Sequence, residues 1–434
     1  MRVVRSKDPT KEVSDGSGPP PHGGRRGCPR CQRRGCLGGV RGRNDHVSEY
    51  DDTQHDDPEH DAAQLGELPE HGLVVRFVEL VRRRLRHAGR RVSERSWAAL
   101  RRRPLRLAPG FLLLLLLAAG CGGGKRGLVS IGAGLQGPSG LRATVYAHGP
   151  LHVSAFTLDT RGRLWITAAG LNGHKGDGVY LVARAGSQPV KVAGGLVSSL
   201  GLVWVDGRLL VSSLGRVTAF SGFDGLRFHT RRVIIDGPVK GGENNNLALA
   251  PNGRVVMGVS ATCDHCTPSG KWSAAVVSFR PDGGDLRVVA GGIRAPFGLA
   301  YRPDTSTLYV SMNQRDDLGD RTPGDWLATV RNGQSWGFPD CYGQDTAACR
   351  NVPSPVGVLD PHAAAGGVAF LGSSAFVAEW QLGKVLRVSL DKERDNVSTF
   401  LTGIQNPLPI VTTTRGAILV GDWSTGTIYR VKNA

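Results

Sequence analysis

Six segments of the chain share one pattern of apolar and polar positions. In each segment a short apolar stretch runs into a tight turn, and a second apolar stretch follows the turn. The segments are AFTLDTRGRLWIT (155–167), LVWVDGRLLVS (202–212), LALAPNGRVVMGV (247–259), LAYRPDTSTLYVS (299–311), VAFLGSSAFVAEW (368–380) and IVTTTRGAILVGDW (410–423). Their second stretches begin near Arg163, Arg208, Arg254, Thr307, Ala375 and Ala417, at steps of 42 to 68 residues. Short apolar runs separated by turn residues predict β-hairpins.

A third apolar strand follows every hairpin, and further strands lie between the units. The third strands are expected at residues 178–183, 215–220, 274–279, 325–330, 384–390 and 427–431, and outer strands at 143–147, 190–194, 231–236, 286–291 and 397–403. A repeated four-stranded unit is typical of a β-propeller. The sequence therefore predicts an all-β fold, a six-bladed propeller of four-stranded antiparallel blades over residues 141–434. A β-sandwich is the alternative, but it requires a Greek-key order that does not repeat in this way.

The two ends of the repeat complement each other. The repeat begins with a single outer strand at residues 142–147 and ends on a third strand at residues 427–432. The N-terminal strand is therefore expected to complete the last blade and to close the ring, which removes exposed sheet edges.

Composition agrees with a turn-rich β protein and excludes several other classes. Glycine contributes 61 of the 434 residues, and hydrophobic residues make up 40%. Glycine without a period of three excludes collagen, and the apolar fraction argues against general disorder. A single short apolar run excludes a membrane protein with many spans.

The first part of the chain has the features of a targeting segment. Residues 1–72 lack hydrophobic periodicity, and residues 73–86 could form a basic amphipathic helix. Residues 1–100 are expected to be a disordered extension or to result from a start codon assigned too far upstream. Residues 101–120 combine an arginine cluster with an apolar run that ends in Ala-Ala-Gly before Cys121. This resembles a bacterial lipoprotein signal, with an ordinary signal peptide as the alternative. Cys121 would then carry the lipid that anchors the protein to the cell membrane, outside the cytoplasm, and residues 121–140 would be a flexible tether.

The charge of +17 divides between two parts of different character. Residues 1–121 hold 23 Lys and Arg against 15 Asp and Glu, a balance of +8, which leaves +9 for residues 122–434. A basic chain often binds nucleic acid. Here the arginine blocks lie before and inside the expected signal, so no nucleic-acid partner is expected.

Polar residues concentrate in the loops that a propeller brings to one face. The densest group is the run from Asn313 to Asp320, with Asp325 just beyond it. Carboxylate and amide oxygens at this density suit Ca²⁺, so Asp316, Asp317, Asp320 and Asp325 are candidate metal ligands. A loop held by salt bridges is the alternative.

Four cysteines lie in long loops of the third and fourth units. Cys263 and Cys266 form one close pair, and Cys341 and Cys349 form another. In a secreted protein two local disulfides are expected from this spacing. Zinc binding by both pairs is the alternative.

Three motifs resemble the glucose/sorbosone dehydrogenase family. They are GGIRAPFGLA at residues 291–300, NQRDDLGDRTPGDWL at 313–327 and WGFP at 336–339. The Cys-x2-Cys loop before AAVVSFRPDG, the LDPH segment at 359–362 and the closing GAILVGDWSTGTIYRV are similar to further family motifs. The resemblance covers about residues 141–434, and the family consists of quinoprotein propellers that use pyrroloquinoline quinone (PQQ).

The resemblance implies a sugar or aldose dehydrogenase with PQQ and Ca²⁺ on the polar face. A sugar hydroxyl would lose its proton to a base and a hydride would pass to the quinone. The residues implied to hold the cofactor are Arg294, Asn244, Asn245, Asn313, Gln314 and Arg315. Arginine suits the carboxylates of PQQ. The sequence does not indicate the sugar or the electron acceptor.

One departure from the family bears directly on catalysis. The family has its general-base histidine just before the third inner strand, where this chain reads GGENNN at residues 241–246. Asparagine cannot act as a base at neutral pH. Ala295 also stands where the family usually has asparagine. Glu243, His265 and His362 are the candidate substitute bases, and a non-catalytic propeller that binds a carbohydrate or an envelope polymer is the alternative function.

Overall fold

The computed structural model describes residues 127–170, 176–237, 243–343, 347–392 and 396–434. The expected extension, signal and lipid-attachment site at Cys121 lie outside these residues. Within the described ranges no helix is long and apolar enough to cross a membrane.

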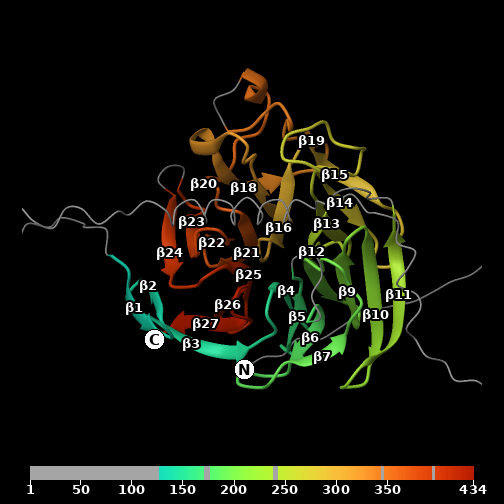
Figure 1. Cartoon of the computed structure of the whole chain (residues 1–434), viewed down its shortest axis with the longest axis vertical. Helices are drawn as coiled ribbons and strands as arrows, with labels where there is room; N and C mark the ends of the chain where they lie inside the picture. The colour runs from blue at the N-terminus through green and yellow to red at the C-terminus, as the bar shows by residue number, and fades with distance from the viewer. Residues whose placement is uncertain (1–126, 171–175, 238–242, 344–346, 393–395) are drawn as a thin grey trace, which may run out of the picture. The chain divides into compact units, whose positions relative to one another are not determined.

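Six antiparallel sheets make up the fold, and each forms one blade (Figure 1). The first contains β4 (Val153–Leu158), β5 (Leu164–Ala168), β6 (Gly178–Val182) and β7 (Val190–Ala193); the second contains β8 (Gly201–Val205), β9 (Arg208–Ser213), β10 (Arg216–Phe223) and β11 (Phe228–Asp236). The third contains β12 (Asn244–Leu249), β13 (Val255–Val259), β14 (Ala275–Phe279) and β15 (Arg287–Gly291), to which the short β19 (Gln334–Ser335) adds in parallel.

The other three sheets repeat this order. The fourth contains β16 (Ala295–Tyr301), β17 (Leu308–Asn313), β18 (Gly324–Val330) and β20 (Gly357–Pro361); the fifth contains β21 (Ala365–Leu371), β22 (Ser374–Glu379), β23 (Lys384–Ser389) and β24 (Val397–Thr402). The sixth contains β25 (Pro407–Thr412), β26 (Ile418–Asp422), β27 (Thr427–Asn433) and β3 (Leu141–His148). Two 3-10 turns, η1 (Gly319–Arg321) and η2 (Ala347–Cys349), are the helical elements among the described residues. The predicted fold class of six four-stranded blades is confirmed.

The inner strands surround the centre of the fold. They contact one another in the cyclic order β4, β8, β12, β16, β21 and β25, and β25 contacts β4 again. The sixth sheet takes its outer strand from the start of the repeat, because β3 pairs antiparallel with β27.

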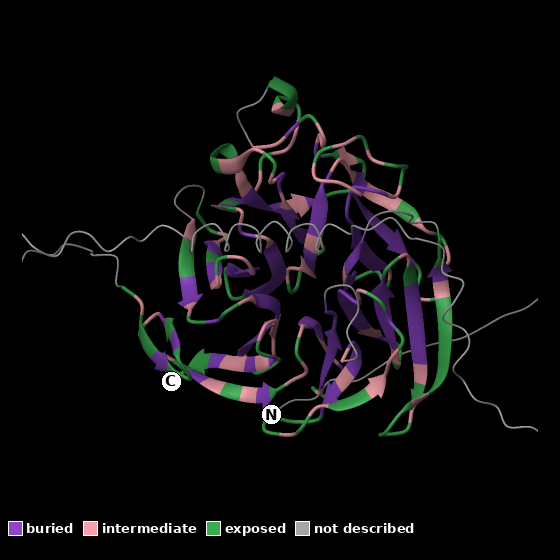
Figure 2. Ribbon diagram, in the orientation of Figure 1, coloured by how far each residue is buried: buried purple, intermediate pink, exposed green. Residues whose placement is uncertain are grey.

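The hydrophobic core lies between neighbouring blades. One cluster joins Trp165 of the first blade to Leu209 and Phe220 of the second, and five similar clusters join the other neighbours around the ring. Figure 2 shows the buried inner and middle strands and the more exposed rim. Because each blade buries both faces, its middle strands are apolar at nearly every position, as β5 and β14 are. This explains the continuous apolar runs in the sequence.

Two details differ from the sequence-based expectation. The tether predicted at residues 121–140 is too long, because β1 (Val129–Gly132) and β2 (Leu135–Gly137) form a hairpin that adds to β24 of the fifth sheet. Ile131 and Leu135 are buried there, which gives the hairpin an apolar anchor that a flexible tether lacks. The sequence also offered no outer strand for the fourth blade, which the structure provides as β20.

Candidate functional site

One face of the propeller, called here the polar face, carries the loops that enter the inner strands and those that join second to third strands. Three inner-strand loops on this face hold a non-glycine residue at positive φ, namely His152 at 63°, Ser198 at 49° and His362 at 54°. Such backbone is strained for residues with a Cβ, and it clusters at functional sites. The loops of the polar face are therefore held in defined conformations.

A buried ion pair forms the centre of the candidate site. Arg294, whose side chain is 5% exposed, is ion-paired with Asp264, and its Nε donates to the carbonyl oxygen of Asp264 at 3.0 Å. The backbone N–H of Asp316 donates to both carboxylate oxygens of Asp264, at 3.0 and 3.1 Å. The Asp316 carboxylate lies 3.8 Å from the Arg294 guanidinium. Three loops from the third and fourth blades thus meet at one carboxylate.

His362 extends this network toward the fifth blade. Its Nδ1 lies 2.9 Å from Oδ1 of Asp316, and its Nε2 lies 2.9 Å from the carbonyl oxygen of Gly319. A carbonyl oxygen only accepts, so Nε2 carries a proton. Burial raises the pKa of Asp316, although Arg294 and His362 oppose the shift.

Both ring nitrogens of His362 are engaged with hydrogen-bond partners. With Nε2 protonated, the short contact at Nδ1 contains one more proton, which belongs either to the imidazole or to the Asp316 carboxyl group. In both cases the proton occupies the Nδ1–Asp316 contact and no ring nitrogen offers a free lone pair. The predicted catalytic role of His362 therefore requires this hydrogen bond to open first.

Arg315 forms a second ion pair on the same face. Its Nε and Nη2 both donate to the carboxylate of Asp317, each at 2.6 Å, and its guanidinium lies 4.5 Å from the ring centre of Tyr342. Hydrogen bonding and charge from Arg315 lower the pKa of Asp317 to about 2. The second predicted cofactor arginine is therefore also occupied by a carboxylate.

The structure does not bring the four predicted calcium ligands together. Asp325 is buried and accepts from the backbone N–H groups of Gln314 at 2.7 Å and Ala365 at 3.0 Å. Burial raises its pKa to about 7. Asp320 is exposed in η1, and Asp316 and Asp317 are engaged with the partners given above. In the described part of the chain no group of three or more His, Cys, Asp or Glu side chains is placed to hold a metal ion.

Two of the predicted cofactor asparagines, Asn244 and Asn245, form hydrogen bonds between neighbouring blades. The amide nitrogen of Asn244 donates to the carbonyl oxygen of Ser213 at 2.9 Å, and that of Asn245 donates to the carbonyl oxygen of Pro296 at 2.9 Å. Both residues are fully buried. Asn313 lies beside Gln314 at the end of β17, and its side-chain oxygen is buried without a hydrogen-bond partner among the described residues. The side-chain oxygens of Asn244 and Asn245 are likewise buried without a hydrogen-bond partner among the described residues.

The other two candidate bases belong to the third blade. Glu243 is buried just before β12, where its carbonyl oxygen accepts from the backbone N–H of Ser260. His265 is exposed between Asp264 and Cys266, with its ring 6.4 Å from that of Tyr342.

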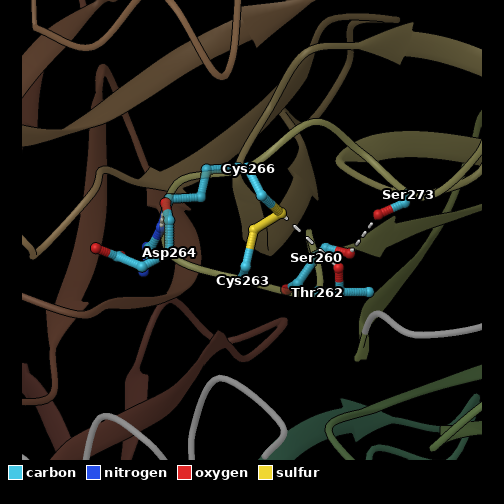
Figure 3. The surroundings of a disulfide bond; sticks show 7 residues. Ser260, Thr262, Cys263, Asp264, Cys266 and Ser273 are labelled. Atoms are coloured by element: carbon cyan, nitrogen blue, oxygen red, sulfur yellow. Dashed lines mark hydrogen bonds and ion pairs between the residues drawn. A yellow bond between two sulfur atoms is a disulfide. The ribbon is translucent and has the colours of Figure 1, made fainter.

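Both expected disulfides are present. Cys263 is bonded to Cys266, and Cys341 is bonded to Cys349. Figure 3 shows the first disulfide, with Asp264 in the loop that it closes and Ser260 and Ser273 beside it. The disulfide restricts the loop that presents Asp264 to Arg294.

An aromatic group also lies on the polar face. The His152 ring is 4.4 Å from the ring of Trp423, which is 5.5 Å from that of Trp380. The Trp423 indole N–H donates to the carbonyl oxygen of Ala169 at 3.1 Å, and all three rings are half-buried. The two tryptophans can be recognised in the sequence, since each of the last two hairpins ends on an acidic residue followed by tryptophan.

A buried carboxyl group lies beside this aromatic group. Glu379 is fully buried, and one of its oxygens accepts from the backbone N–H of Asp360 at 3.2 Å. Burial, reinforced by Asp360, raises its pKa to about 8 although Lys384 lies 3.5 Å away. This side chain therefore holds a proton near neutral pH.

The charges of the network leave no unpaired cation for PQQ. Arg294 and Arg315 are matched by Asp264 and Asp317, and the pair of His362 and Asp316 is neutral in either proton arrangement. A tricarboxylate needs cations that are not already paired. The cavity beside Arg294 measures about 10 Å³, which is room for about one water molecule. In this arrangement Arg294 or Arg315 would hold PQQ only after Asp264 or Asp317 moves away from the guanidinium.

Comparison with known proteins identifies the fold. No family model matches the chain, and no curated protein matches it. Among solved structures, the holo form of the pyranose dehydrogenase PQQ domain from Coprinopsis cinerea is 17% identical, with a TM-score of 0.58 over 69% of this chain and 97% of that one. The PQQ-bound aldose sugar dehydrogenase from Streptomyces coelicolor is 16% identical, with a TM-score of 0.56 over 68% and 99%.

A third similar structure was determined with calcium. It is a Trichoderma reesei carbohydrate-active enzyme of family AA12, which is 15% identical, with a TM-score of 0.58 over 69% of this chain and 96% of that one. At such identities the likeness establishes the fold, a six-bladed propeller of the kind found in PQQ-dependent sugar dehydrogenases.

Proposed function

We propose that this propeller binds a sugar on its polar face and oxidises it as a PQQ-dependent sugar dehydrogenase. The observation that carries the proposal is the Asp264–Arg294–Asp316–His362 network, which lies on a fold shared with known sugar dehydrogenases. The half-buried rings of His152, Trp380 and Trp423 on the same face offer apolar surface for the C–H face of a sugar. PQQ would serve as the hydride acceptor.

This activity requires two of the contacts in the network to open. For the Arg294 guanidinium to hold a carboxylate of PQQ, Asp264 must move away from it. For His362 to accept the proton of a sugar hydroxyl, its contact with Asp316 must open. Both changes involve loops, whereas the strands beneath them can stay in place.

A second candidate function is sugar binding without turnover. It is favoured by the balanced charges of the network and by the absence of histidine from residues 243–249. The aromatic group and its hydrogen-bonded surroundings could hold a saccharide with no cofactor present.

A titration with PQQ separates the two functions. The purified protein is titrated with PQQ by absorbance, and dye reduction is then measured with a panel of aldoses in the presence of Ca²⁺. A dehydrogenase binds PQQ and reduces dye with at least one aldose. A binder gives a tryptophan fluorescence change with a saccharide and no dye reduction. Absence of PQQ binding and of dye reduction would exclude the first function.

The variant Asp264→Asn tests the condition directly. It removes the carboxylate that competes for Arg294, so the affinity for PQQ should rise by about tenfold, the effect of one charge-assisted hydrogen bond. Asp320→Asn is the matched control, because it removes the same charge from an exposed position on the same face. An equal rise in both variants would point to a general effect of charge.

We also propose that the protein is a lipoprotein anchored outside the cytoplasm through Cys121. The support is the sequence alone, an arginine cluster and an apolar run followed by Ala-Ala-Gly-Cys. Replacing Cys121 by serine should release the protein from the membrane fraction and abolish labelling by palmitate. Retention of both properties in the variant would overturn this proposal.

A further inference from the structure

An open cleft lies on the opposite face of the propeller, between the third and fourth blades. Its volume is about 410 Å³, within the range of small-molecule sites. Its lining includes Arg254, Arg287 and Arg331, together with Val256, Tyr301 and Leu308. Asn252 and Ser306 belong to the tight turns between first and second strands, which places the cleft away from the Arg294 network.

A segment of the fourth blade crosses to the third blade and forms one wall of the cleft. β19 pairs in parallel with β15, and the backbone N–H of Gly333 donates to the carbonyl oxygen of Val289 at 2.8 Å. The turn before β19 is closed by the side chain of Gln334, which accepts from the backbone N–H of Arg331 at 2.7 Å. The backbone of Arg331 is therefore fixed at the cleft.

The cleft carries an excess of positive charge. Of the described residues that line it, three are arginines and none is Asp or Glu. Arg254 and Arg287 share one carboxylate, that of Asp285, at 2.9 and 2.7 Å. The described residues offer Arg331 no carboxylate within ion-pair distance. Three guanidinium groups against one carboxylate leave a local balance of +2.

One of the arginines is held in place before any ligand arrives. Arg254 is 21% exposed, and its Nη2 donates to the carbonyl oxygens of Asp285 at 2.6 Å and Ser278 at 3.2 Å. A fixed guanidinium loses little conformational entropy on binding. Below it, the side chains of Val256 and Leu308 give the cleft an apolar floor.

Tyr301 adds a hydrogen-bonding group to this floor. It is half-buried at the end of β16, and burial raises the pKa of its hydroxyl, so the group stays neutral and can donate. Asn252 and Asn332 contribute amides at the edge. Cations, neutral donors and an apolar floor together match a small molecule that has a charged end and a hydroxylated body.

We propose that this cleft binds a sugar-sized ligand that carries a phosphate or carboxylate group. The anionic group would lie among Arg254, Arg287 and Arg331, and the rest of the molecule would lie over the floor. The site is separate from the polar face, so its test does not depend on whether the protein is a dehydrogenase.

Calorimetric titration of the purified protein tests the proposal with four probes. Glucose 6-phosphate and glucuronate distinguish a phosphate from a carboxylate, inorganic phosphate tests the anion alone, and glucose tests the neutral sugar. At least one of the two charged sugars should bind at least about tenfold more tightly than glucose, the effect of one charge-assisted hydrogen bond. Arg331→Gln and Arg287→Gln should each weaken that binding by about tenfold for the same reason.

Matched variants give the experiment its controls. Arg232→Gln removes an exposed arginine of β11, outside the cleft, and should leave binding unchanged. Arg331→Lys keeps the charge and should retain most of the affinity. Because Arg331 and Arg287 are exposed, both glutamine variants are expected to fold, which circular dichroism would verify. Equal binding by the wild type and both glutamine variants, or no binding of any anionic probe, would overturn the proposal.

Discussion

The two faces of the propeller handle positive charge in opposite ways. On the polar face Arg294 and Arg315 each have their own carboxylate, and Asp316 lies against His362. In the cleft of the other face Arg254 and Arg287 share Asp285, and the described residues offer Arg331 no carboxylate. The number of arginines is therefore a poor guide to anion binding, and the charges within ion-pair distance decide whether a guanidinium is available.

Burial separates the two faces as well. The Arg294 side chain is 5% exposed, whereas that of Arg287 is 67% exposed. A buried cation must be paired in the folded protein, because an isolated buried charge is strongly unfavourable. An exposed cation is solvated by water, so it can remain unpaired and accessible to a ligand. On the polar face Arg294 and Arg315 are held in ion pairs, whereas in the cleft Arg331 has no carboxylate partner among the described residues.

The largest expected effect is on stability. Arg294→Ala leaves Asp264 and Asp316 without their shared cation and should lower the free energy of unfolding by about 3 kcal/mol. Arg331→Ala, in the cleft, should change it by less than about 0.5 kcal/mol. Urea denaturation of the two variants measures both values. Similar losses in both would contradict the division of roles between the faces.

A second difference should appear in the pH dependence of stability. The pKa of Glu379 on the polar face is raised to about 8 by burial, so the folded state keeps a proton that the unfolded state loses near pH 4. The contribution of Glu379 to stability is therefore present at low pH and is lost as the pH rises toward 8. Between pH 5 and pH 6.5 the loss should be about 2 kcal/mol. Glu379→Gln should remove this contribution and leave that of Asp325, whose pKa burial raises to about 7. An unchanged slope would contradict the assignment.

In the cleft, the stability contribution of Asp285 should depend on pH in the opposite direction. Hydrogen bonding from Arg287, followed by Arg254, lowers the pKa of Asp285. Its contribution to stability is present above pH 4 and is lost as the pH falls below that value. Asp285→Asn should make the protein less sensitive to acid below pH 4, as followed by thermal unfolding. Greater acid sensitivity in this variant would contradict the assignment.

The smallest expected effect concerns salt. Ligand binding in the exposed, cationic cleft should weaken by a few fold when the salt concentration rises from about 0.05 to about 0.5 M, because screening is strong at exposed charges. Binding of a neutral sugar on the polar face should change by less than about twofold over the same range. Parallel titrations of the two ligands at both salt concentrations measure this difference. Equal salt dependence of the two affinities would contradict the prediction.

The repeat in the sequence was sufficient to predict the blades. Each hairpin buries both faces in a propeller, so the apolar runs at residues 155–167 or 247–259 mark the inner strands without any long-range information. The hairpin of β1 and β2 was missed because glycines interrupt its few apolar residues, and because Ile131 and Leu135 gain their burial only against the fifth and sixth blades. Strand β20 was missed for a related reason: it is short and follows a long loop.

The sequence predicted which residues belong to the candidate site, but it did not predict which of them pair with one another. The sequence placed Arg294, Asp316 and His362 on one face, and the structure brings these three together. The sequence did not indicate that Asp264 is the partner of Arg294, because the two residues lie 30 positions apart and belong to different loops. For the same reason Asn244 and Asn245 resembled cofactor ligands, although their amides hold neighbouring blades together.

The sequence by itself determined the all-β repeat, the six blades and the face on which the polar loops gather. These depend on local apolar periodicity and on turns, which neighbouring residues encode. Only the tertiary structure decided which charges are free, because an ion pair is made by residues from different loops that the ring brings within a few ångströms. It paired Arg294 with Asp264 on one face and left Arg331 available on the other.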